Sequence, residues 1–112
     1  MPHSEREVVR LCQAADVVEG APVAVDIQRL PPLVVYQVDS DYYVTDNRCT
    51  HGNGMLSEGF QDGSRIECPF HGGAFDIRSG EAVMFPCQKP VRTYPVSIVD
   101  GWIAIPAVMQ ED

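Results

Sequence analysis

Residues 47–73 read NRCTHGNGMLSEGFQDGSRIECPFHGG, and this stretch contains two of the four cysteines and two of the three histidines of the chain. They form two pairs, Cys49 with His51 and Cys68 with His71. Glycines follow each pair, and glycine permits unusual backbone angles and a close approach of the chain to a bulky inorganic centre. Because thiolate and imidazole both bind metals, the stretch predicts a metal centre held by two loops.

Two kinds of centre agree with this set of ligands. Two cysteines and two histidines form a common structural zinc site, but zinc-binding arms usually pair Cys with Cys and His with His. Here each arm mixes the two types. A dinuclear iron centre accounts for the mixture, because each arm can give its thiolate to one iron and its imidazole to the other, as in a Rieske [2Fe–2S] cluster.

At this point the sequence resembles a known family. The boxes CTHG, from residue 49, and CPFHGGAFD, from residue 68, look like the Rieske signature. The neighbouring segments YYVTDNRCTHG, LSEGF, IECPFHGGAFDIRSGEA and KPVRTYPVSIVDG resemble the small Rieske ferredoxins of bacterial ring-hydroxylating dioxygenase systems. The resemblance implies one Rieske-type [2Fe–2S] cluster, with Cys49 and Cys68 on the inner iron and His51 and His71 on the outer, more exposed iron.

The rest of the chain indicates an all-β protein. Apolar residues alternate over several short runs, as in half-buried strands, and Gly, Pro and Asp separate the runs. One short helix is expected over residues 12–20, which end in Gly20. Asp39–Asp41 and Asp100-Gly101 are predicted to be hairpin turns. The expected strands are 7–11, 22–27, 33–38, 42–46, 93–99 and 102–105.

The middle of the chain is richer in glycine and poorer in strand pattern than its two ends. It therefore looks like an insertion between the hairpins of a β base. The family resemblance implies the Rieske fold, an antiparallel β-sandwich-like base with a smaller cluster-binding subdomain at its tip. We expect a single domain over residues 1–112, with the base at about 1–46 and 86–112 and the cluster-binding subdomain at about 47–85.

Charge and hydropathy exclude several classes of partner. The formal net charge is −8, with 8 basic against 16 acidic residues, which disfavours nucleic acid. No apolar run approaches the roughly 18 residues of a membrane span, and the first residues lack the apolar segment of a signal peptide. We therefore expect a cytoplasmic protein without a membrane partner. In that compartment cysteines stay reduced, which favours ligands over disulfides.

The boxes differ from those of the quinol-oxidising Rieske proteins. Those relatives carry a disulfide and two hydroxyl groups beside the cluster. The positions that match the disulfide are Gly54 and Phe70, and those that match the hydroxyl groups are Gly73 and Phe75. Hydrogen bonds to sulfur stabilise the negative charge added on reduction, so their loss lowers the reduction potential. We expect a potential of about −150 mV, at the low end of the Rieske range.

The resemblance implies a one-electron carrier and not an enzyme. It would pass electrons from an NAD(P)H-dependent flavoprotein reductase to a terminal ring-hydroxylating oxygenase in aromatic compound degradation, with no small-molecule substrate pocket. We expect the edges of His51 and His71 to form the docking tip, within an apolar rim of Pro69, Phe70 and Pro86. The alternatives are a small Rieske subunit of another oxidoreductase, such as a nitrite reductase, and a structural zinc module.

Two cysteines lie outside the boxes. Cys12 is expected to pack as a small apolar residue at the end of a strand. Cys87, in the segment FPCQKP, could lie near the cluster on a third covering loop, but packing is the favoured role. Neither cysteine is expected to bind the metal.

Overall fold

In the part of the chain that the structure describes, the fold is built from short antiparallel strands and two single turns of 3₁₀ helix. A computed structural model describes residues 7–50, 52, 54–70 and 72–107. The two 3₁₀ turns are η2 (Ala14–Asp16) and η3 (Leu56–Glu58). The strands are β1 (Val8–Gln13), β2 (Val23–Val25), β3 (Leu33–Val38), β4 (Asp41–Asp46), β5 (Phe60–Asp62), β6 (Arg65–Glu67), β7 (Ala74–Asp76), β8 (Ala82–Met84), β9 (Thr93–Tyr94), β10 (Ser97–Val99) and β11 (Trp102–Pro106).

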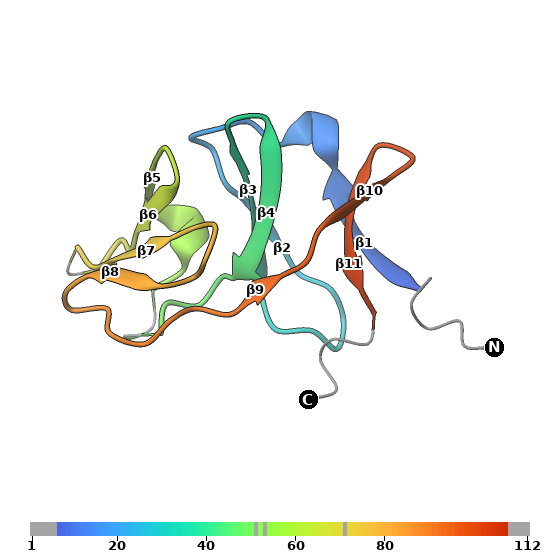
Figure 1. Cartoon of the computed structure of the whole chain (residues 1–112). Helices are drawn as coiled ribbons and strands as arrows, with labels where there is room; N and C mark the ends of the chain where they lie inside the picture. Colours follow the sequence, from blue (N-terminus) through green and yellow to red (C-terminus); the bar gives the residue numbers. More distant parts are fainter. Residues whose placement is uncertain (1–6, 51, 53, 71, 108–112) are drawn as a thin grey trace.

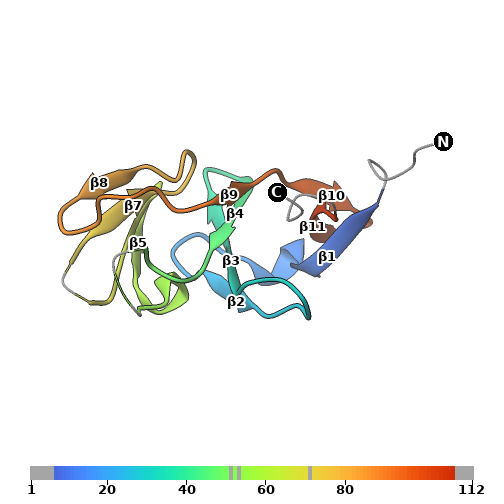
Figure 2. The ribbon, with the colours of Figure 1, turned by 90° about the horizontal axis from the view of Figure 1, so that it is seen from below.

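These strands form three antiparallel sheets that follow one another along the molecule (Figures 1 and 2). The central sheet has the order β2-β3-β4-β9, and one neighbour has the order β1-β11-β10. The third sheet, β5-β6-β7-β8, lies at the other end and is formed entirely by the chain between β4 and β9. The prediction of an all-β antiparallel architecture is confirmed.

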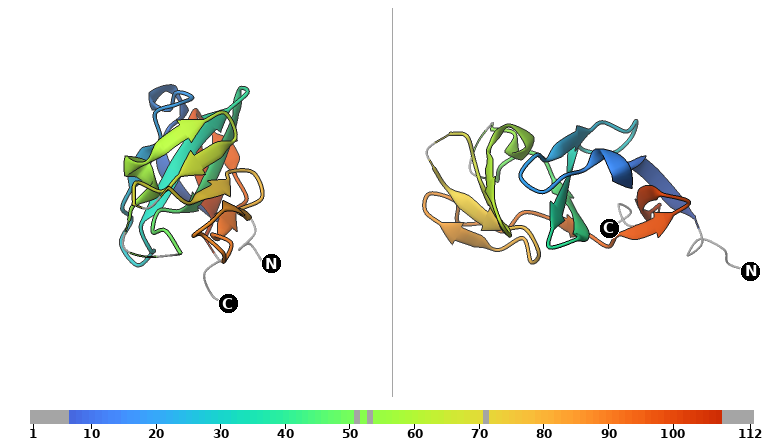
Figure 3. Two further views of the ribbon diagram at one scale, coloured as in Figure 1. Left: turned by 90° about the vertical axis from the view of Figure 1, so that its left-hand side faces the viewer. Right: turned by 90° about the horizontal axis from the view of Figure 1, so that it is seen from above.

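The central sheet is covered on both faces, and β3 explains how. Leu33 and Val35 pack into a core shared with β1 and β11, whereas Val34, Tyr36 and Val38 pack into a second core that includes Leu56, Ile66 and Phe75. Successive strand residues point to opposite faces, so a strand between two cores needs apolar residues at nearly every position. This is why LVVYQV is a continuous apolar run. Figure 3 shows the central sheet between the other two from a further direction.

Both predicted hairpin turns are present, although Asp41, which was predicted to be in the first turn, is the first residue of β4. Asp39 and Ser40 join β3 to β4, and Asp100 and Gly101 join β10 to β11. All four residues have a positive φ, between 51° and 81°. Positive φ at both central residues is the geometry of a two-residue turn whose twist matches that of the strands, and Asp and Gly adopt it most readily.

The structure corrects two of the expected elements. The helix predicted over 12–20 is wrong, because Cys12 and Gln13 belong to β1 and only Ala14–Asp16 form a turn of 3₁₀ helix. The single strand predicted over 93–99 is interrupted at Pro95. Proline has no N–H to give to a ladder, and the chain changes sheets there: Tyr94 pairs with Val44, while Ile98 pairs with Ile103.

The backbone packs so closely around Gly59 that there is no room for a side chain. Gly59 follows η3 and precedes β5, and a Cβ atom placed on it would collide with the carbonyl oxygen of Glu67. We expect Gly59→Ala to lower the free energy of unfolding by about 1–3 kcal/mol, because the neighbour is backbone and cannot rotate away. Urea unfolding of the two proteins measures this. The control is Gly52→Ala, where a Cβ would have no neighbour within 4 Å.

Candidate metal centre

The two boxes are held by two loops with the same backbone hydrogen bond. The Cys49 N–H donates to the carbonyl oxygen of Gly54 over 2.9 Å, and the Cys68 N–H donates to that of Gly73 over 2.7 Å. In each case the cysteine and the glycine five residues later close the loop at its base. The first loop follows β4, and the second connects β6 to β7. The two loops thus have the same backbone closure, although they follow different strands.

Both cysteine side chains of the boxes are buried in one core. Cys49 and Cys68 are 2% and 4% exposed and pack in the same cluster as Leu56, Ile66 and Phe75. Burial raises the pKa of the Cys68 thiol, a hydrogen bond from the Phe70 N–H lowers it, and the neighbouring Cys49 raises it. Two buried thiols that interact with each other are suited to bind a soft metal, and they are shielded from solvent.

The histidines of the boxes, His51 and His71, lie outside the described residues. Among the residues that the structure describes, no group of three or more His, Cys, Asp and Glu side chains is placed to hold a metal. The described part of the site is therefore the pair of thiols and the loop backbone. The assignment of Cys49, His51, Cys68 and His71 as ligands remains a proposal.

Two glycines let the backbone of the loops approach the thiols closely. A Cβ on Gly54 would lie 2.9 Å from the Cys68 Sγ. A Cβ on Gly73 would collide with the Cys87 Sγ and lie 2.9 Å from the Cys87 backbone nitrogen. Both glycines are buried. At both positions a cysteine sulfur lies where a side chain would be, so only glycine lets the loop backbone pack directly against the thiols.

The comparison with protein families decides what kind of centre this is. Residues 7–95 match the model of the Rieske [2Fe–2S] domain. The chain belongs to the Rieske family. Its cofactor is accordingly one Rieske-type [2Fe–2S] cluster, and the structural zinc module considered from the sequence is rejected.

Relatives of known name agree with this assignment. The chain is 40% identical over 100 residues to the ferredoxin component of the p-cumate 2,3-dioxygenase system of Pseudomonas putida, a match that covers 88% of this chain and 85% of that protein. The solved structure of the Sphingomonas yanoikuyae B1 ferredoxin has a TM-score of 0.88 and 59% identity, and covers 89% of this chain and 98% of that one.

A second similar structure contains a ferredoxin together with its partner. It is described as a complex of reduced oxygenase and oxidised ferredoxin in carbazole 1,9a-dioxygenase. The TM-score is 0.83 and the identity 38%, over 88% of this chain and 92% of that one. All three relatives are named as ferredoxins, and the names of two of them include a dioxygenase.

A third loop covers the Rieske site of this chain, and the sequence indicated its place. Cys87 follows β8, is 5% exposed, and places its Sγ 3.7 Å from the Cys49 Sγ. Burial raises the pKa of its thiol to about 12, and the neighbouring Cys49 adds to this rise. The Thr50 hydroxyl donates to the Lys89 carbonyl over 2.7 Å and ties the first loop to the third. The packing role favoured for Cys87 is thus incomplete, because the thiol contacts a predicted ligand.

The apolar rim predicted beside the site is present in part. Phe70 is 51% exposed at the second loop, and Pro69 is exposed beside it. Pro86 is half-buried, and the larger exposed side chain of the third loop is its neighbour Phe85, at 75% exposure. Sequence reasoning missed Phe85. An aromatic residue directly before the Pro-Cys pair was the available signal.

The first loop of the Rieske site is anchored by a buried side chain that sequence reasoning also missed. Asn47 lies between β4 and Cys49 and is 4% exposed. Its Oδ1 accepts a hydrogen bond from the Ser57 N–H over 2.7 Å, and its Nδ2 donates to the Ser57 Oγ over 3.0 Å. This amide fixes the segment after the loop to the segment before it.

We expect Asn47→Ala to destabilise the protein by about 1–3 kcal/mol, because it leaves the partly buried Ser57 N–H without its acceptor. Thermal unfolding followed by circular dichroism measures the change. Ser57→Ala is the matched control, since it removes only the Oγ acceptor and keeps the backbone hydrogen bond. A loss in Asn47→Ala no larger than that in Ser57→Ala would contradict the anchoring role.

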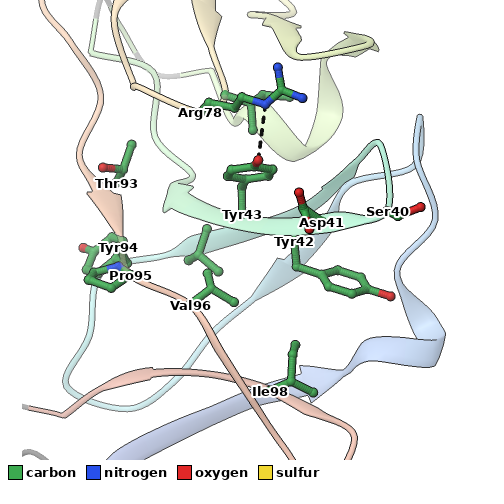
Figure 4. A pocket seen from close by; sticks show the side chains of 12 residues that line it. Ser40, Asp41, Tyr42, Tyr43, Arg78, Thr93, Tyr94, Pro95, Val96 and Ile98 are labelled. Atoms are coloured by element: carbon green, nitrogen blue, oxygen red, sulfur yellow. Dashed lines mark hydrogen bonds between the residues drawn. The ribbon is translucent and has the colours of Figure 1, made fainter.

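An open groove of about 660 Å³ lies apart from the cysteine loops, where the chain between β7 and β8 faces the central sheet (Figure 4). Its side chains include Tyr42, Tyr94, Val96 and Ile98, with Arg78 at one side. Arg78 Nε donates to the Tyr43 hydroxyl over 3.2 Å, and its Nη2 lies 3.0 Å from Asp39 Oδ2. These contacts link the β7 end to the hairpin of β3 and β4. None of Cys49, Cys68 and Cys87 lines the groove.

Among the described residues, no helix has the length and apolar character needed to cross a membrane.

Proposed function

We propose that this chain is a Rieske ferredoxin that carries one electron at a time from an NAD(P)H-dependent flavoprotein reductase to a terminal ring-hydroxylating oxygenase. The observation that carries the proposal is the similarity, over most of both chains, to ferredoxin components of aromatic dioxygenase systems. The carbazole 1,9a-dioxygenase complex supports the oxygenase as the second partner. The reductase is inferred from the need for an electron donor.

The proposed roles of the residues follow from the chemistry of their side chains. Cys49 and Cys68 would hold one iron through thiolates, and His51 and His71 would hold the other iron through imidazole nitrogens. When bound, the cluster accepts and releases one electron. The loop backbone keeps water from the sulfur atoms and positions the thiolates. We keep the division into a base at about 1–46 and 86–112 and a cluster-binding subdomain at about 47–85 as part of this proposal.

The docking surface of this proposal combines the two histidines with the exposed aromatic side chains of the second and third loops. Phe70 follows Cys68 in the second loop, and Phe85 precedes Cys87 in the third. A small apolar surface of this kind suits a carrier that binds briefly and leaves. The net charge of −8 favours partners with a basic docking face, because complementary charge raises the rate of encounter.

The alternative is a small Rieske subunit held permanently in another oxidoreductase. A permanent subunit needs a larger and more apolar interface than a transient carrier. The names of the relatives favour the carrier. For this function we propose a cytoplasmic location, where a nicotinamide-dependent reductase operates, and no pocket for the aromatic substrate.

Reconstituted turnover tests the proposal. The chain is mixed with a ferredoxin reductase, NADH and a terminal ring-hydroxylating oxygenase, and formation of the dihydroxylated aromatic product is followed. We expect product only when all the components are present, at a rate proportional to low concentrations of this chain. Rapid reduction of the chain by the reductase without any transfer to several such oxygenases would favour the alternative of a subunit of another oxidoreductase.

A further inference from the structure

We propose that the Cys87 thiol donates a hydrogen bond to the Cys49 sulfur and raises the reduction potential of the cluster. The inference rests on the proposed role of Cys49 as a ligand. It gives Cys87 a positioning and tuning role, without a bond to iron. The observation is the distance of 3.7 Å between the two buried sulfur atoms.

The direction of this hydrogen bond is fixed by the chemistry of the partners. The distance alone does not say which of the two sulfur atoms is the donor. A cysteine that binds iron does so as a thiolate and has no proton to donate. Cys87 is not one of the proposed ligands, so it carries the S–H group of an ordinary cysteine, and its Sγ lies within hydrogen-bond distance of the Cys49 Sγ. Cys87 is therefore the donor and Cys49 the acceptor.

The backbone around Cys87 holds the thiol in this position. The Cys87 N–H donates to the Met84 carbonyl over 3.1 Å, and the Thr50 hydroxyl holds the same loop through the Lys89 carbonyl. On the other side, Gly73 has no Cβ, and the Cys87 Sγ occupies the space that a side chain there would need. The thiol thus fills the place beside position 73, where we expected the lack of a hydroxyl donor to lower the potential.

The effect on the potential follows from the charge of the two redox states. Reduction adds one negative charge, and part of it resides on the sulfur ligands. A donor directed at a ligand sulfur stabilises the reduced state more than the oxidised one and so raises the potential. Without the Cys87 donor, we expect the reduction equilibrium to shift toward the oxidised form by up to about tenfold, which for one electron is about 59 mV.

Three substitutions at position 87 separate hydrogen bonding from packing. Cys87→Val keeps an apolar side chain of similar size without a donor, Cys87→Ala removes the donor and leaves space, and Cys87→Ser keeps a donor. We expect the midpoint potential to fall in the Val and Ala variants and to stay level or rise in the Ser variant. Cys12→Ala, in β1 of the base, is the control and should leave the potential unchanged. A Val variant with the potential of the unmodified protein would overturn the proposal.

A second measurement does not depend on substituting Cys87. In the cluster-loaded Cys12→Ala protein, Cys87 is the one cysteine left with a thiol proton, so a single S–H stretching band is expected in the infrared spectrum. We expect this band at lower frequency than that of an unbonded thiol, with a further decrease on reduction of the cluster. A band at the unbonded position in both redox states would overturn the proposal even if every variant at position 87 lost its cluster. A protein with no Rieske signal at all would instead overturn the proposed function.

Discussion

Replacement of Cys68 by alanine is expected to abolish the Rieske EPR signal and to lower bound iron more than tenfold. Removal of groups that only support a metal ligand already costs about 10–100-fold in affinity, so loss of a ligand itself should cost at least as much. Cys49→Ala is expected to give the same result. The Cys68 thiol is 4% exposed and lies beside a second buried cysteine, so a water molecule cannot easily take its place as a ligand.

The remaining cysteines provide the controls for this experiment. Cys12→Ala should keep full iron and an unchanged signal, because Cys12 lies in β1 and packs against the core of the base. Cys87→Ser should also keep the cluster, with only its potential open to change. Iron content is measured on proteins assembled and purified side by side. If Cys68→Ala retained a rhombic Rieske signal at full iron content, the ligand assignment would be wrong.

The second large effect is expected in transfer to the oxygenase. Phe85→Ser is predicted to slow electron transfer to a terminal oxygenase at least about tenfold, and Phe85→Ser with Phe70→Ser to slow it further. Aromatic side chains at the centre of an interface commonly cost more than about 1–2 kcal/mol when they are removed. Phe85 is 75% exposed in the structure, so its replacement removes contact area in the complex at little cost to the fold.

Stopped-flow oxidation of the reduced ferredoxin by the oxygenase measures this rate. The control is Ile98→Ser, because Ile98 is a large apolar residue that is 50% exposed but lies on β10, at the other end of the molecule (Figure 1). The midpoint potential of each variant is measured in parallel, so that a change in driving force is separated from a change in docking. Equal rates for Phe85→Ser and Ile98→Ser would rule out the third loop as part of the docking surface.

Much of the fold could be predicted because local signals and tertiary packing agree. The strand at 33–38 was predicted with its observed bounds, since each of its residues but Gln37 is buried between two cores. The turns at Asp39-Ser40 and Asp100-Gly101 were predicted because few residue types adopt the positive φ that they require. In both cases the local sequence pattern and the tertiary structure favour the same conformation.

Other elements could not be predicted because their signal lies outside the local sequence. The strands β5 to β8 have three residues each, which is too short to establish a period of two. The split of 93–99 depends on Tyr94 joining the sheet of β4 and Ile98 joining that of β11, which no local pattern contains.

The candidate site likewise contains residues that the sequence predicts and a contact that it does not. Cys49 and Cys68 stand out through their spacing from His51 and His71, so a sequence pattern suffices to propose them. Cys87 lies 3.7 Å from Cys49 although 38 residues separate them. Its place beside the site depends on how the chain returns after β8. The sequence could suggest a covering loop there, but only the structure gives the contact between the two sulfur atoms.

A potentiometric titration of the purified protein followed by EPR tests the central claim most directly. The account predicts a one-electron Rieske signal with a midpoint of about −150 mV, which a reductase fed by NADH can supply. The hydrogen bond from Cys87 contributes to this potential, and its removal should make the midpoint more negative. A clearly positive midpoint would contradict the account, because the chain would then belong with a high-potential partner and not between a flavoprotein reductase and an oxygenase.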